Sequence, residues 1–191
     1  MVGLYKLLLL LLLLLPAHWI AESKLNFIPN KIECENYMPT FLTNLACVLK
    51  SNDLNETVID MDFIAVRELN NTSVSFSFNV MIGKSTVNYI NKRFDICTRT
   101  GQDALEDHII TRVISEEIKK SGNILNDCPY KKNKHYYVHG FKVKEHSIPP
   151  YFPEMNLTIT IDLVTNRRKT MRFLAFGRSV KVGKITSRII P

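Results

Sequence analysis

The sequence predicts a mainly β protein, an antiparallel sandwich or barrel with one inserted amphipathic helix. Two segments, residues 74–82 and 156–164, alternate between apolar residues and others, which is typical of strands with one face turned from water. The apolar positions of these two stripes are Val74, Phe76, Phe78, Val80 and Ile82, then Leu157, Ile159, Ile161 and Leu163. Residues 102–120 instead place apolar residues at helical spacing, with charged residues on the opposite face.

The other strands are predicted from β-branched and aromatic residues that lie between turn signals. The expected strands, seven or eight in number, cover residues 25–36, 45–50, 57–67, 74–82, 86–97, 135–145, 156–164 and 170–182. Pro29 is expected to break the first strand, since proline cannot donate a hydrogen bond to a β-ladder. The helix is expected to run without interruption through residues 102–120 and to end at Gly122 as its C-cap.

The first 23 residues are predicted to be a secretory signal peptide. Lys6 precedes an unbroken run of leucines at residues 7–15, and small residues follow up to the expected cleavage after Ser23. The run is shorter than the roughly 20 apolar residues that a transmembrane helix needs. Cleavage after Ala21 and an uncleaved signal anchor are the alternatives. Residues 24–191 then form one domain of ordinary size, which we expect outside the cell.

Four cysteines, Cys34, Cys47, Cys97 and Cys128, are predicted to form two disulfides. Sequence alone allows three pairings, of which the neighbour pairing Cys34–Cys47 and Cys97–Cys128 is the simplest. A zinc site is the weaker alternative, because no CxxC pair accompanies His135 and His139, and we therefore expect no metal. The glycan acceptors of the N-x-S/T pattern are Asn55, Asn70, Asn71 and Asn156.

The charge and the motifs favour binding rather than catalysis. The formal net charge is +7, which in an exported protein favours an anionic membrane surface, a lipid headgroup or plain solubility over nucleic acid. The basic turns at residues 131–134 and 167–169 are the candidate contacts. No GxSxG, HExxH or glycine-rich phosphate loop occurs, and His108 and Asp107 are expected to point apart on a helix. We expect no enzyme activity and no cofactor, and His108 is expected at the surface.

A block around the expected helix carries a resemblance to a known family. It begins with Asp-Ile-Cys at residues 95–97 and ends with Cys-Pro-Tyr at residues 128–130, and Cys34 and Cys47 precede it. With the proline turn at residues 151–156, this pattern resembles a secreted insect family of unknown function, expanded in flies, whose hallmark is D-x-C…CPY. The resemblance covers residues 31–182.

That family is in turn distantly similar to the ML superfamily of lipid-recognition domains, which includes sterol carriers and the ganglioside activator. The matching run is CPYKKNKHYYV at residues 128–138. The chain departs from the family pattern at Thr98, Arg99 and Thr100, which follow Cys97, so we expect the start of the helix to differ from that of the family. It also lacks the late cysteine that many ML proteins carry.

The resemblance implies an immunoglobulin-like, ML-like β-sandwich whose two sheets splay apart around a lipid, sterol or hydrocarbon. Its implied role is a secreted carrier, with chemosensation as one setting. A secreted protein-binding module, such as a receptor co-ligand in immunity or signalling, is the alternative. The helix is expected either to cover a pocket as a lid or to pack as a structural layer. The candidate pocket residues are Phe63, Val74, Phe76, Phe78, Val80, Ile109, Val113, Leu157, Ile159 and Ile161.

Overall fold

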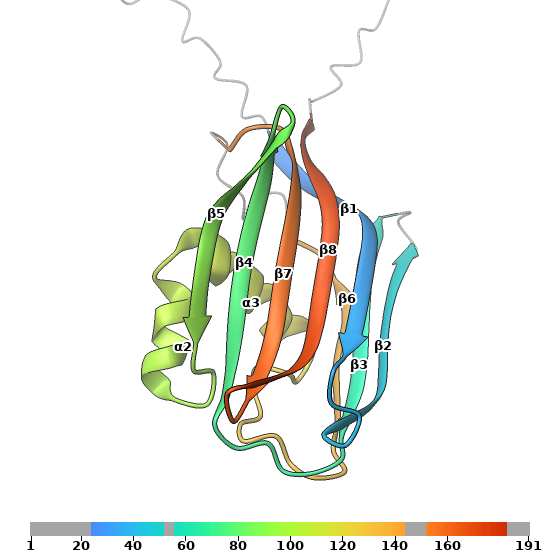
Figure 1. The fold of residues 1–191 in the computed structure, drawn as a ribbon. Coiled ribbons are helices and arrows are strands. Elements are labelled where there is room, and N and C mark those ends of the chain that lie inside the picture. The colour runs from blue at the N-terminus through green and yellow to red at the C-terminus, as the bar shows by residue number, and fades with distance from the viewer. Residues whose placement is uncertain (1–23, 52–55, 144–151, 183–191) are drawn as a thin grey trace, which may run out of the picture.

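Two antiparallel sheets and two helices make up the computed structural model, which describes residues 24–51, 56–143 and 152–182 (Figure 1). The five-stranded sheet has the order β1-β8-β7-β4-β5, and the three-stranded sheet has the order β2-β3-β6. The strands are β1 (Lys24–Asn36), β2 (Leu42–Ser51), β3 (Thr57–Ala65), β4 (Thr72–Ile82), β5 (Ser85–Phe94), β6 (His135–Phe141), β7 (Met155–Thr165) and β8 (Arg168–Val182). The predicted fold class, a mainly β antiparallel sandwich with a small helical part, is confirmed. The signal peptide predicted for residues 1–23 lies outside the described residues.

The two apolar stripes lie side by side at the centre of the five-stranded sheet. In the β4–β7 ladder, Phe76 pairs with Ile161 and Phe78 pairs with Ile159. Both stripes therefore point to the same face, and this face looks towards the second sheet and the helices (Figure 1). The last member of the first stripe, Ile82, is 63% exposed, because β4 extends beyond that cover.

Pro29 does not end the first strand, so the expected break is wrong. Strand β1 continues through it along β8, and the register shifts between Pro29 and Lys31. An irregularity of this kind lets an edge strand accommodate a residue that has no backbone N–H. Strand β1 is an edge of the sheet, so the missing donor leaves no neighbouring strand unpaired on its outer side.

The helical segment consists of two helices, α2 (Arg99–Glu106) and α3 (Ile109–Ser121), so the prediction of one continuous helix is wrong. His108 has an extended backbone, with φ −116° and ψ 130°, and its Nδ1 accepts a hydrogen bond from the Ile110 N–H at 3.2 Å. Thr111 donates to the carbonyl oxygens of Leu105 and His108, which ties the two helices together. The apolar spacing continues almost in phase from α2 into α3, so periodicity alone could not reveal the break between the two helices. Neither helix in this part of the chain is long and apolar enough to cross a membrane.

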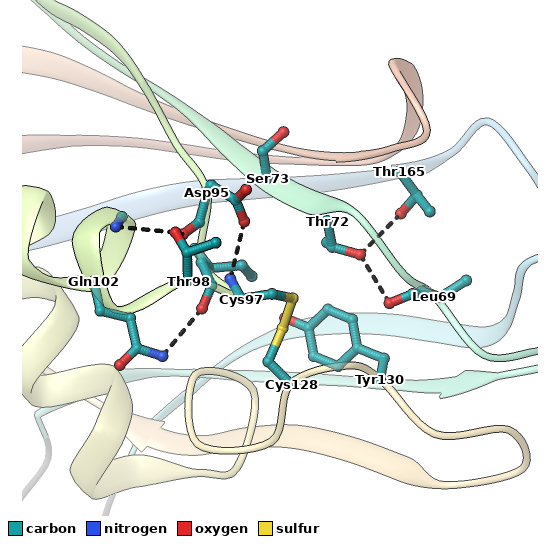
Figure 2. The surroundings of a disulfide bond; sticks show 12 residues. Leu69, Thr72, Ser73, Asp95, Cys97, Thr98, Gln102, Cys128, Tyr130 and Thr165 are labelled. Carbon is teal, nitrogen blue, oxygen red and sulfur yellow. Dashed lines mark hydrogen bonds between the residues drawn. A yellow bond between two sulfur atoms is a disulfide. The ribbon is translucent and has the colours of Figure 1, made fainter.

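The sequence after Cys97 starts α2. Thr98 is its N-cap, and its hydroxyl accepts a hydrogen bond from the Gly101 N–H at 3.1 Å and donates one to the Asp95 carbonyl oxygen (Figure 2). Gln102 also donates to the Ile96 carbonyl oxygen. The Thr98 side chain therefore supplies a good N-cap, and the sequence after Cys97 does not disturb the helix start.

Both disulfides follow the neighbour pairing. Cys34 of β1 is bonded to Cys47 of β2, which ties the two sheets together. Cys97, just after β5, is bonded to Cys128, which precedes β6 (Figure 2). The second bond closes the segment that carries both helices, so α2 and α3 are held against the sandwich at both ends.

On the outer face of the five-stranded sheet, the carboxylate of Asp162 has two cationic partners. Asp162 accepts hydrogen bonds from Arg172 at 2.7 and 3.1 Å, and Lys169 lies 2.9 Å from its second oxygen. Burial by itself would raise the pKa of Asp162, but the hydrogen bonds from Arg172 and Lys169 outweigh it and hold the pKa below its usual value. This carboxylate therefore stabilises the folded state in its ionised form.

Replacing Asp162 by asparagine is expected to lower the free energy of unfolding at pH 7 by about 1.5–3 kcal/mol, the range for hydrogen bonds to charged groups. Because the folded pKa is depressed, this contribution is complete above the unfolded value near 3.9 and is lost as pH falls through the folded value. Urea unfolding at pH 7 and at pH 3 measures it, and the gap between wild type and variant should shrink at the lower pH. Glu33→Gln, which alters the exposed pair with Lys31, is the control and should change little. A gap that is equal at both pH values contradicts this assignment.

Candidate ligand-binding cavities

Two cavities lie on the inner face of the five-stranded sheet. The inner cavity, of about 100 Å³, lies between the two sheets and the helices, with walls that include Met61 of β3, Phe76 of β4 and Ile118 of α3. The outer cavity, of about 130 Å³, lies between β5, β7 and the start of α3. Phe27, Ile114 and Ile159 line both, so the two cavities adjoin across these three side chains.

The inner cavity offers no free polar group among its described lining residues. Its three hydroxyl-bearing side chains are Thr111, Ser115 and Tyr130. Thr111 donates to the carbonyl oxygens noted above, Ser115 donates to Arg112 O at 2.9 Å, and Tyr130 donates to Ile124 O at 2.9 Å. Burial raises the pKa of Tyr130, so its hydroxyl stays a neutral donor. A surface of this kind suits a hydrocarbon and gives water nothing to bind.

The outer cavity has a polar rim. Tyr89, on β5, is 60% exposed, and its ring meets the His108 ring edge-on with centroids 6.3 Å apart. Ile109 and Val113 lie beside them on α3, and both line the cavity. Ile109 is 37% exposed, so the first turn of α3 forms part of an open mouth rather than of a closed core. Helix α3 is therefore both a packed layer and one wall of the cavities.

His108 was missed as a site residue, because it was expected to lie at the surface. It is partly buried, and it caps α3 while lining the outer cavity. Since Nδ1 accepts from the Ile110 N–H, the neutral ring carries its proton on Nε2. Burial lowers the pKa of His108, and the positive charge of nearby Lys92 lowers it further. The signal in the sequence was an Asp-His pair, two weak helix formers, at the centre of the apolar pattern.

The structure brings eight of the ten candidate pocket residues to the cavities. Val74, Phe76 and Ile161 line the inner one, Phe78, Ile109, Val113 and Leu157 line the outer one, and Ile159 lines both. Phe63 and Val80 line neither. Both are buried, and the Phe63 ring stacks on Tyr136 at 5.4 Å and meets Tyr130 edge-on at 6.0 Å. Ligand binding by the eight residues remains a prediction.

The other predicted surface sites have the following positions. Asn70, Asn71 and Asn156 are exposed, as glycan acceptors must be, and Asn55 lies outside the described residues. In the basic turns, Lys134 pairs with Asp127 and Lys169 pairs with Asp162, so these two cations already have partners. Docking on an anionic surface and glycan attachment both remain predictions.

Two histidines share one carboxylate on the outer face of the small sheet. The Nε2 atoms of His135 and His139 each lie 2.8 Å from Asp62 Oδ1. Among the residues that the structure describes, no cluster of His, Cys, Asp or Glu has the geometry to hold a metal ion. These contacts fix β6 to β3 from outside, on the face turned away from the cavities.

The comparisons with known proteins give a family match and a likeness to a solved structure. No curated protein matches the chain. The solved structures that it resembles include a Niemann-Pick type C2 protein from Japanese carpenter ant, with 15% sequence identity and a TM-score of 0.30 over 83% of this chain and 93% of that one. Residues 73–159, which run from β4 through both helices into β7 and supply much of the walls of both cavities, match the family model described as a protein of unknown function (DUF1091).

Proposed function

We propose that this protein is a secreted carrier that binds a lipid or another hydrophobic small molecule between its sheets. The observation that carries the proposal is the pair of adjoining cavities, whose inner member has an apolar lining with every lining hydroxyl bonded to a backbone carbonyl. Each CH₂ group that moves from water into such a space gains about 0.8 kcal/mol. An alkyl chain can therefore bind without any charged contact in the interior.

The cavities are unlike the interior of a protein that only needs a stable fold. Natural cores pack to crystal-like density and leave few voids larger than a water molecule. An apolar cavity of about 150 Å³ stays dry and binds small hydrocarbons. Here two spaces of comparable size adjoin, and one of them opens at a rim where Tyr89 and Ile109 are exposed. The arrangement supports uptake of a chain from outside, such as a hydrocarbon signal in chemosensation.

Replacing Val113 by phenylalanine fills part of the outer cavity and is expected to weaken uptake of a fluorescent fatty-acid analogue about tenfold, the equivalent of excluding roughly two CH₂ groups. Fluorescence titration of the secreted protein measures this, after delipidation and identification of the extracted lipids by mass spectrometry. Val48→Phe on β2, where the side chain is 45% exposed and lines neither cavity, is the matched control. The carrier function is wrong if the wild-type protein neither retains a lipid nor takes up any fatty acid, sterol or long-chain hydrocarbon. That result would favour a protein-binding module.

A further inference from the structure

We propose that the ligand is a single-tailed alkyl carboxylate, with its carboxylate at the rim of the outer cavity beside His108 and Tyr89 and its tail running towards the inner cavity. The inference rests on the proposed carrier function and adds the chemical class and the orientation of the ligand. It follows from the polarity of the two cavities, the donors at the rim and the charge nearby.

The rim presents two hydrogen-bond donors. The Nδ1 atom of His108 is occupied as the cap of α3, so the N–H on Nε2 is the group left to donate. The Tyr89 hydroxyl is the second donor, on a ring that packs against the His108 ring and the Phe78 ring. Neither the His108 Nε2 atom nor the Tyr89 hydroxyl has a hydrogen-bond partner within the described ranges of the chain.

The charge at the rim favours an anion over a neutral headgroup. Lys92 lies on β5 near His108, and within the described residues it forms no ion pair. The first turn of α3 contains no acidic residue. Asp107 precedes His108 and is exposed, so it faces solvent. A carboxylate at the rim would gain hydrogen bonds to a charged acceptor, which are about twice as strong as neutral ones.

The apolar interior favours entry of the alkyl tail, so the carboxylate stays at the rim. Apart from His108, Tyr89 and Ser179, the described lining of the outer cavity is apolar as far as Phe27, Ile114 and Ile159, the three residues shared with the inner cavity. The Ser179 hydroxyl already donates to the Pro153 carbonyl oxygen at 2.7 Å. The inner cavity has no free donor or acceptor for a second headgroup. Two small spaces that adjoin in this way suit one flexible chain better than a rigid fused-ring system.

The test compares three probes of equal chain length, dodecanoate, dodecanol and dodecane, in competition with a fluorescent fatty-acid analogue. The proteins are the wild type, Tyr89→Phe and His108→Ser. Serine is itself a good N-cap, so His108→Ser removes the rim donor and keeps the start of α3. Thermal melting of each protein followed by circular dichroism shows whether it is folded.

The wild-type protein is expected to prefer dodecanoate over dodecane by about tenfold or more, the effect of one hydrogen bond to a charged acceptor. Each variant should lose most of that preference and keep its affinity for dodecane. In NMR titration, dodecanoate should raise the pKa of His108, because a nearby negative charge favours the protonated ring, and dodecane should not.

Equal wild-type affinities for the three probes would overturn the carboxylate site and leave the carrier function standing. So would folded variants that keep the full preference for dodecanoate. Failure of the wild-type protein to bind any of the three probes would count against the carrier function itself.

Discussion

Replacing Gly122 by alanine is expected to prevent the chain from accumulating as a folded, secreted protein. A Cβ atom at this position would lie 1.9 Å from the Tyr137 carbonyl oxygen and 2.8 Å from the Val138 Cα, and both are backbone atoms of β6. Gly122 has φ −175°, an extended backbone, so it is required for the close approach and not for a left-handed turn. It ends α3, forms a bridge to Val138, and so closes the free edge of the small sheet.

The close approach of Gly122 to β6 cannot relax at a low cost in free energy, because neighbouring hydrogen bonds hold the two segments together. Asn123 donates its backbone N–H to Tyr137 O at 3.1 Å, and its side-chain oxygen accepts from the Tyr137 N–H at 2.9 Å. Moving α3 away to admit a methyl group would break these bonds and open the inner cavity. The amount of protein secreted from cultured cells, with limited proteolysis of the product, measures the effect.

Gly83→Asp is the matched control for this substitution. Gly83 has φ +62° in the β4–β5 turn, and a Cβ atom there would meet nothing within 4 Å. Aspartate tolerates the left-handed region and creates no N-x-S/T acceptor before Ser85, so this variant should be secreted at close to the wild-type level. Normal secretion and protease resistance of Gly122→Ala would show that α3 does not pack against β6 as described.

The strands could be predicted from the sequence because each lies between turn signals and carries either a period-two pattern or β-branched and aromatic residues. Their long-range pairing could not, since the order β1-β8-β7-β4-β5 joins β1 to β8 and β4 to β7, which are far apart in the chain. The break between α2 and α3 was also missed. It depends on the cap at His108 and on the Thr111 hydroxyl, and neither changes the apolar spacing.

For the candidate site, the alternation predicted which face of a strand is buried but not what lies opposite. Val74 and Phe76 face the inner cavity, whereas Val80 on the same stripe lines no cavity and Ile82 is exposed. The difference depends on how far the second sheet and the helices extend over β4, which is a tertiary property. The rim donor His108 could not be predicted from the sequence for the same reason, since only the fold brings it beside Tyr89 of β5.

Replacing Phe63 by alanine is expected to lower the free energy of unfolding by about 3–5 kcal/mol without changing ligand affinity. The side chain is fully buried and packs in an aromatic cluster with Tyr130 and Tyr136, whose rings lie 4.7 Å apart. The Tyr136 hydroxyl accepts from the Lys131 N–H at 2.7 Å, so the cluster also fixes the segment before β6. For a chain of this size the melting temperature should fall by roughly 6–20 °C.

Phe76→Ala is the matched comparison, because it makes the same chemical change at a residue that is 3% exposed and lines the inner cavity. Both variants should lose stability, since each removes a buried ring. Only Phe76→Ala should change the dissociation constants for alkyl chains, with the longest chains gaining most from the enlarged space. If Phe63→Ala altered those constants in a folded protein, the aromatic cluster would belong to the ligand site after all. If neither variant did, the inner cavity would be a packing defect, and the tail of the ligand would end in the outer cavity.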